Sequence, residues 1–128
     1  MVDQKKYWIE IAQYDIDTAR VMFNGKRFLY VGFMCHQVIE KILKAYFVQT
    51  MNETPPYIHN LTVLAKKSGI YAAFSEEQKD LIDILEPLNI EARYPTTKEK
   101  LMQSLNKEKC ESILQKTEVL FLWIKTKL

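Results

Sequence analysis

The sequence predicts an all-α protein, built as an up-and-down bundle of four long helices and one short helix. Apolar residues recur at the three- and four-residue spacing of helices along most of the chain, and no segment alternates convincingly like a strand. Only 3 Gly and 4 Pro punctuate the chain, and they fall where helices are expected to stop or bend. A length of 128 residues with 48% hydrophobic and 27% charged residues suits one core. We therefore expect residues 1–128 to form a single domain.

The first two helices follow from their apolar spacing. The first is expected over residues 3–24, where Asn24 and Gly25 form a C-terminal stop. The second is expected over residues 30–50, before the Pro55-Pro56 pair excludes a helix. The apolar face of the first consists of Trp8, Ile11, Ala12, Ala19 and Met22. That of the second consists of Val31, Cys35, Val38, Ile39, Ile42, Ala45 and Tyr46.

Capping residues mark the next two helices. Asn60 is expected to cap a short third helix, which Gly69 ends. Ser75 and Gln78 have the spacing of a capping box and begin the fourth helix. Residues expected to point inward are Leu61, Leu64 and Ala65 in the third helix and Leu81, Ile84, Leu85 and Leu88 in the fourth.

Prolines shape the end of the fourth helix and separate it from the last one. Pro87 lies inside the fourth helix and should kink it, and Pro95 should end the element. Residues 96–105 are expected to hold at most one weak helical turn. The last helix is expected from about residue 106 to near residue 128, with Cys110, Ile113, Leu114, Thr117, Leu120, Phe121 and Ile124 in register.

Charge and composition exclude several classes of protein. A formal charge of +2 does not argue for a nucleic-acid-binding protein, although a local basic patch stays open. No apolar run is long enough to span a membrane, and the first ten residues lack the apolar core of a signal peptide. We expect a cytoplasmic protein with Cys35 and Cys110 as buried thiols. Metal-binding, glycine-rich phosphate-binding and serine-hydrolase motifs are all absent from the sequence, so no metal and no cofactor are expected.

The second helix carries a polar stripe that is flanked by aromatic residues. An ordinary surface helix would not place two aromatic rings beside its polar side, so we expect a face that is covered, as in a subunit interface. Glu40 and Lys44 also have the favourable order for an ion pair one turn apart, as on a plain solvated surface, and that alternative stays open. The predicted interface residues are Phe33, His36, Gln37, Glu40 and Phe47.

Asp15 is an anomaly, because it lies in the middle of the first helix's apolar stripe. A buried carboxylate without a partner is unfavourable by several kcal/mol, so it needs a partner or water. Candidate partners are Lys44, His59 and Arg93. These contacts could form either a structural polar pair between helices or part of a ligand site.

Two further residues are candidates for binding a ligand. His59 precedes the third helix, where it could cap the chain, bond to a carboxylate or face a ligand. Arg93 and Tyr94 precede Pro95, whose ring restricts the backbone before it and so fixes how they project. An Arg held in this way can bind phosphate or carboxylate with two hydrogen bonds, although a structural Arg–Asp bridge explains it equally well. The predicted ligand-binding residues are Asp15, Lys44, His59, Arg93 and Tyr94.

Four segments together resemble the HEPN family (higher eukaryotes and prokaryotes nucleotide-binding). They are Trp8 with residues 15–19, the run CHQVIEKILKA at residues 35–45, PPYIHNL at residues 55–61, and ARYP at residues 92–95. The resemblance implies a helical bundle that usually dimerises and often acts with a minimal nucleotidyltransferase. Many members are RNA-cleaving toxins with an Arg, a short polar spacer and a His. No His follows Arg93 here, so the chain resembles the non-nuclease branch.

The resemblance and the polar residues lead to one favoured hypothesis and two alternatives. The favoured one is a non-catalytic homodimeric module that binds a nucleotide and partners a nucleotidyltransferase. The alternatives are a metal-independent ribonuclease of a toxin–antitoxin pair, with a degenerate site formed by His59 and Arg93, and a domain that binds only proteins. All depend on charged side chains from separate segments meeting in a cleft or dimer seam.

Overall fold

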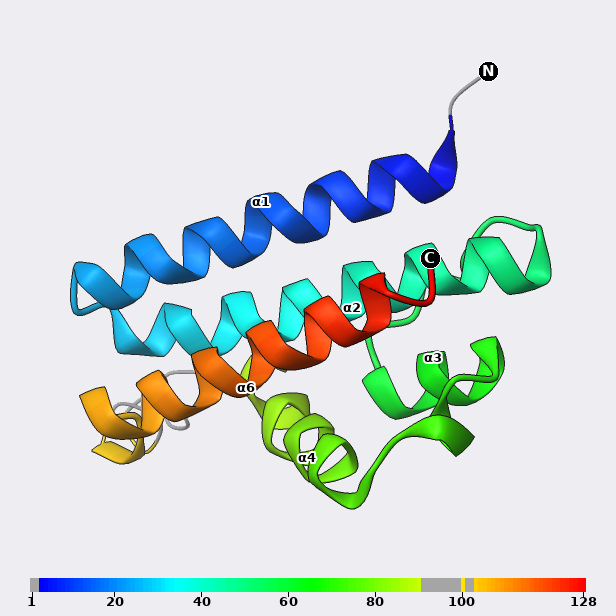
Figure 1. Ribbon diagram of the computed structural model, residues 1–128. Coiled ribbons are helices and arrows are strands. Elements are labelled where there is room, and N and C mark those ends of the chain that lie inside the picture. Colours follow the sequence, from blue (N-terminus) through cyan, green and yellow to red (C-terminus); the bar gives the residue numbers. More distant parts are fainter. Residues whose placement is uncertain (1–2, 91–99, 101–102) are drawn as a thin grey trace.

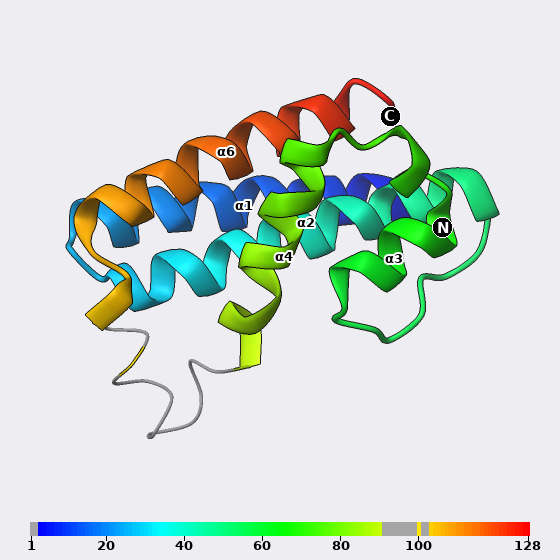
Figure 2. The ribbon, with the colours of Figure 1, turned by 90° about the horizontal axis from the view of Figure 1, so that it is seen from below.

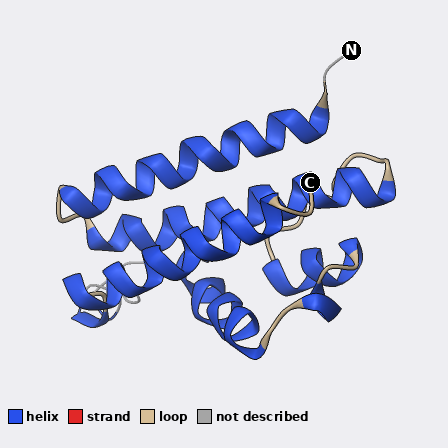
Figure 3. Cartoon of the chain, viewed as in Figure 1, coloured by secondary structure: helices blue, strands red, loops and turns tan. Residues whose placement is uncertain are grey.

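In the computed structural model, which describes residues 3–90, 100 and 103–128, the described chain is all-helical (Figure 3), as predicted. Its order is α1 (Gln4–Asn24), α2 (Phe28–Met51), α3 (Leu61–Ser68), the 3-10 turn η1 (Tyr71–Ala73), α4 (Glu76–Ile90) and α6 (Lys107–Lys125). Helix α1 runs antiparallel to α2, and α6 runs in the same direction as α2 (Figure 1). Helix α4 instead crosses α2 and α6 steeply (Figure 2).

The helix ends lie close to where the sequence predicted them. Asp3, Asn60 and Asn106 accept backbone N–H bonds from the residue three positions on, at 3.1, 2.9 and 2.8 Å. Ser75 and Gln78 form both hydrogen bonds of the capping box, at 2.8 and 3.1 Å. Gly69 has φ +88°, a left-handed conformation that favours glycine, and it ends α3 as expected.

Helix α2 is the centre of the bundle, and it contacts α1, α3, α4 and α6. Buried side chains of α2 therefore point in most directions around its axis and are not confined to one face. Gly32 allows α4 to approach closely, because a Cβ at that position would lie 2.9 Å from Leu88 Cδ1. The apolar core is formed mainly by α2, with α1, α4 and α6 packed around it.

Several details of the predicted core differ in the structure. Ile84 was expected to point inward but is 39% exposed, whereas Leu81, Leu85 and Leu88 of the same helix are buried, so α4 packs with a narrower apolar face than the spacing predicted. Ile16, which the predicted stripe omitted, is fully buried. Helix α4 continues through Pro87 to Ile90. Pro95 and most of the weak turn expected at residues 96–105 lie outside the described residues.

No helix among the described residues is both long and apolar enough to cross a membrane.

Candidate functional site

A buried carboxylate, Glu40, is the centre of a polar cluster inside the bundle. Only 1% of its side chain is exposed. Its Oε1 lies 3.1 Å from His59 Nδ1 and 3.8 Å from His36 Nδ1. Its Oε2 lies 3.3 Å from Lys44 Nζ and 3.4 Å from Lys41 Nζ. Three of these partners belong to α2, whereas His59 comes from the segment between α2 and α3, so the cluster depends on tertiary structure.

The surrounding positive groups keep Glu40 ionised. Burial is the largest single influence on its pKa, and it favours the neutral acid. The charges of Lys41 and Lys44, together with the charge and hydrogen bond of His59, outweigh burial and hold the pKa of Glu40 below its usual value. Glu40 therefore supplies a fixed negative charge at neutral pH.

Glu40 also orients the ring of His59. The ionised carboxylate can only accept, so Nδ1–H of His59 donates to it at 3.1 Å. Whenever this ring is neutral, its lone pair is on Nε2, because each neutral imidazole has one donor and one acceptor nitrogen. The side chain of His59 is 47% exposed, and its ring contacts Tyr57 edge-on at 5.0 Å between centroids.

Lys44 connects the cluster to two aromatic rings. Its Nζ lies 5.2 Å from the ring centroid of Trp8 and 5.9 Å from that of Tyr57. These distances are within the range of cation–π attraction, which strengthens as the cation loses water. Trp8 is partly buried and Tyr57 is 90% exposed, so the cluster reaches the surface at this aromatic pair.

A hydrogen-bonded chain continues from the cluster to α4. Lys41 Nζ donates to Gln37 Oε1 at 2.7 Å, and Gln37 Nε2 donates to Asn89 Oδ1 at 2.8 Å. Asn89 is buried in α4. These hydrogen bonds link Lys41 and Gln37 of α2 to a partner in another helix. Buried polar groups require such partners.

His36 is fully buried beside Glu40. Neither ring nitrogen has a hydrogen-bond partner among the described residues. Burial, only partly offset by the charge of Glu40, lowers the pKa of His36 to about 4. His36 is therefore neutral at physiological pH.

Glu86 of α4 holds the start of α3 beside this cluster. Its Oε1 accepts hydrogen bonds from the backbone N–H groups of Leu61 and Thr62, the second at 3.3 Å. Burial raises the pKa of Glu86 and exceeds the lowering effect of these two bonds. This anchor places His59, two residues before Leu61, next to α2.

Comparisons with known proteins agree with this architecture. The HEPN domain model matches residues 5–127. The chain belongs to the HEPN family. A solved structure, TT1696 from Thermus thermophilus, has a TM-score of 0.83 and 16% identity, covering 99% of this chain and 100% of TT1696, and it shares the fold. Among curated proteins, no match was found.

The structure of this HEPN domain brings together only some of the predicted ligand-binding residues. Lys44 and His59 meet on Glu40. Asp15 is partly buried near Lys41 and Glu40. Its pKa is raised, mainly by burial and also by the charge of Glu40, and the charge of Lys41 offsets only part of this effect. Lys41 was not among the partners expected for Asp15. Arg93 and Tyr94 lie outside the described residues.

The residues predicted to form an interface are largely covered by the chain itself. His36, Glu40 and Phe47 are buried within one copy, and Phe33 and Gln37 are partly exposed. These residues are covered within one copy by elements that include α4 and the segment before α3. A role in a subunit interface stays a prediction.

Four residues of the cluster were not predicted as site residues, and one of them, Lys41, directly follows Glu40 in the sequence. Trp8 was assigned only to the apolar stripe, Tyr57 was noted only within the PPYIHNL run, and Asn89 was not considered. The separation of these last three residues from Glu40 along the chain hid the association. No group of three or more potential metal ligands is found in the described part of the chain.

Proposed function

We propose that this HEPN domain is a non-catalytic binding module for a nucleotide, which acts as a homodimer with a minimal nucleotidyltransferase. The observation that carries the ligand part is the meeting of Lys44 and His59, from separate segments, on one buried carboxylate beside two aromatic rings. A nucleotide offers what such a surface binds: an aromatic base, hydroxyl groups and phosphate.

Each group at the mouth of the cluster suits one part of a nucleotide. The exposed ring of Tyr57 offers a surface on which a base stacks, an interaction of about 1–3 kcal/mol. The Nε2 lone pair of His59 accepts a hydrogen bond from a hydroxyl or an amino group. Lys44 attracts phosphate, and Arg93 is the proposed second phosphate ligand. Glu40 orients the histidine and lysine without contacting the ligand.

Nucleotide binding is tested by thermal denaturation and calorimetric titration with ATP and GTP. At ten times its dissociation constant, a ligand stabilises the folded state by about 1.4 kcal/mol, which raises Tm by a few degrees. Lys44→Met and Tyr57→Ser should each weaken binding by about tenfold, because each removes about 1–2 kcal/mol of contact. No heat and no Tm shift at millimolar nucleotide would exclude the ligand part.

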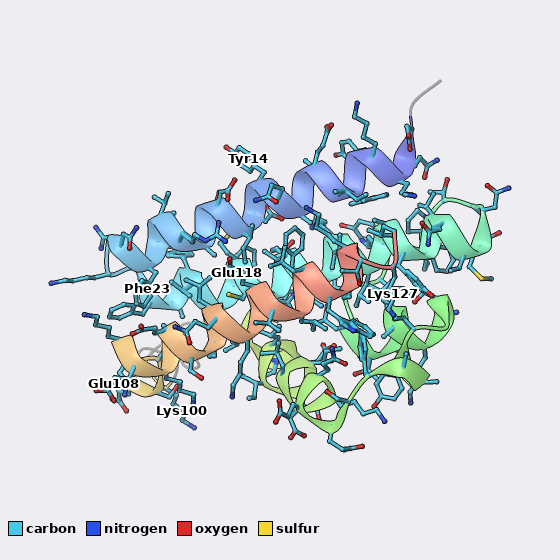
Figure 4. The ribbon with its side chains drawn as sticks, in the orientation of Figure 1. Tyr14, Phe23, Lys100, Glu108, Glu118 and Lys127 are labelled. Carbon is cyan, nitrogen blue, oxygen red and sulfur yellow. The ribbon has the colours of Figure 1, made fainter. Side chains whose placement is uncertain are left out.

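Lys109→Met is the matched control for Lys44→Met. Lys109 is exposed near the start of α6, next to Glu108, which Figure 4 shows at the far end of the helix from Lys127. It carries the same charge and side chain but lies outside the aromatic pair. It should leave nucleotide affinity unchanged, and an equal loss in both variants would indicate general charge attraction in place of a site.

The dimer and the partner are tested separately from the ligand. Sedimentation velocity should give twice the chain mass of 15.1 kDa, and Phe33→Glu should shift the protein toward monomer. Co-expression with a minimal nucleotidyltransferase encoded beside the gene should yield a stable complex. A monomer at micromolar concentration, or separate elution of the two proteins, would contradict these parts of the proposal.

One observation favours a ribonuclease as a second candidate. His59 bonds through Nδ1 to the buried Glu40 carboxylate while its side chain stays 47% exposed, and a neutral ring held in this way can act as a general base through Nε2. Such a base could take the proton of an RNA 2′-hydroxyl while Arg93 binds the phosphate. Cleavage of tRNA or mRNA by purified protein, lost in His59→Ala, would favour this candidate. If the RNA stays intact after prolonged incubation, the ribonuclease is excluded and the binding module remains as the proposed function.

A further inference from the structure

Three aromatic rings lie in contact where η1 meets the end of α6. Tyr71 and Phe74 have ring centroids 6.0 Å apart, and Phe74 and Trp123 are 5.8 Å apart in an edge-on arrangement. Phe74 is buried and anchors the row, whereas Tyr71 and Trp123 are partly exposed. The view of Figure 2 shows the end of α6 near the segment that holds η1.

Lysines from three further segments surround the two partly exposed rings. The Nζ atoms of Lys66 and Lys79 each lie 5.0 Å from the ring centroid of Tyr71. Lys127 Nζ lies 4.9 Å from the ring of Trp123. We name Lys66, Tyr71, Lys79, Trp123 and Lys127 the basic–aromatic surface. It combines residues of α3, η1, α4 and the C-terminal end of α6 that lie far apart in the sequence.

The lysines of this surface form one ion pair within the described residues. Lys79 pairs with Glu76 at 3.7 Å, and the Glu76 side chain is 88% exposed, so the pair is weak. Lys66 and Lys67 occupy the last turn of α3, where the helix dipole favours cations. Lys66 and Lys127 have no carboxylate partner among the described residues, so their charge is available to an anionic ligand.

We propose that the basic–aromatic surface binds single-stranded nucleic acid without cleaving it. Lysines with aromatic rings between them are what such a ligand requires, because phosphates pair with the ammonium groups and unpaired bases stack on the rings. An exposed cation–π contact is worth about 0.5–1 kcal/mol, so the lysines can leave the rings for phosphate. An acidic protein would pair with the ammonium groups but has no bases to stack on the aromatic rings. The proposal is independent of nucleotide binding near Glu40.

The two tryptophans allow the two surfaces to be observed separately. Trp8 lies beside Lys44 and Trp123 lies in the basic–aromatic surface. In a Trp8→Phe background, a twelve-residue oligouridylate should quench Trp123 fluorescence as it stacks. When the same oligonucleotide carries a fluorescein label, its fluorescence anisotropy should rise to a plateau as protein is added. Contacts by three lysines predict that log K falls with log salt at a slope of about −2.

Charge-reversed pairs test the location. Lys66→Glu with Lys127→Glu should weaken binding by at least about tenfold at about 0.1 M salt, since two phosphate contacts become repulsive. The matched control is Lys107→Glu with Lys109→Glu, which makes the same change in net charge with two exposed residues in the first turn of α6. The control pair should keep most of the affinity.

Three outcomes would overturn the proposal. The first is an absence of saturable binding at low salt, and the second is an equal loss of affinity in the control pair. The third is equal quenching of Trp123 by polyglutamate, which would assign the surface to acidic polypeptides. ATP binding reported by Trp8 in a Trp123→Phe background would be unaffected by any of these results, so failure of one proposal is distinguishable from failure of the other.

Discussion

At the scale of single residues, Glu40 is the group on which the polar cluster depends. It has an ion pair or hydrogen bond with His59, Lys41 and Lys44, and it is almost completely buried. A buried pair contributes little compared with apolar packing, but removal of one partner leaves the other charge buried and unpaired. The lysine most affected is Lys44, which is itself buried.

Glu40→Gln should therefore lower the free energy of unfolding by about 3 kcal/mol, because Lys44 would stay buried without a counter-charge. Urea denaturation followed by circular dichroism measures this change. The control is Glu10→Gln, an exposed carboxylate 3.9 Å from Lys6, which should change stability by less than about 0.5 kcal/mol. Similar losses in both variants would show that Glu40 does not anchor the cluster.

His36 should make stability depend on pH in a defined window. Its pKa is about 4 in the folded protein, below the ordinary histidine value of 6.5, so the unfolded chain binds more protons between these two pH values. Stability from this group is complete above about pH 6.5 and is lost as pH falls toward 4. The difference corresponds to roughly 3 kcal/mol.

Denaturation midpoints measured from pH 4 to pH 7 test this expectation. His36→Leu replaces the titrating ring by an apolar side chain. The stability of this variant should therefore vary less over this pH range than the stability of the wild type. Identical pH profiles for the two proteins would contradict a buried neutral His36.

At the scale of elements, the packing of α4 on α2 depends on Gly32. A Cβ there would lie 2.9 Å from Leu88 Cδ1 and 3.5 Å from Leu105 Cδ1. Gly in the middle of a helix is unfavourable by roughly 0.5–1 kcal/mol relative to Ala, and close approach of α4 gives it a structural reason.

Gly32→Val should destabilise the protein by about 1–3 kcal/mol, because its methyl groups overpack the contact with Leu88. The control Gly25→Ala should be almost neutral, since Gly25 has φ −85° and its nearest atom is 3.4 Å from an added Cβ. Thermal denaturation measures both. A stable Gly32→Val variant would show that α4 can move away from α2 at little cost.

At the scale of the whole molecule, the central position of α2 predicts cooperative unfolding. Helices α1, α3, α4 and α6 all contact α2, so none of them can lose its packing without affecting the shared core. Single domains of this size usually unfold in one all-or-none transition.

The tryptophans of α1 and α6 provide a test of cooperativity. In Trp123→Phe, fluorescence reports on Trp8, and in Trp8→Phe it reports on Trp123. Each fluorescence midpoint in urea should coincide with the circular dichroism midpoint of the same variant. Separate midpoints for the two probes within their own variants would indicate two folding units and contradict the predicted single domain.

The elements of this HEPN domain were predictable because their determinants are local. The side chains of Asp3, Asn60 and Asn106 bond to backbone three residues away, and the capping box of Ser75 and Gln78 closes over the same distance. Helical periodicity also identified Cys35, Leu64 and Ile113 as core residues. Such interactions are visible in a short window of sequence.

The candidate site was only partly predictable, because its members meet through packing. The sequence alone determined the helices, their caps and the unusual polar residues Glu40, Lys44 and His59. Only the tertiary structure placed Trp8, Tyr57 and Asn89 around them and turned Ile84 outward. Helical periodicity specifies which residues share a face, but the crossing angle and rotation of each helix decide which faces meet.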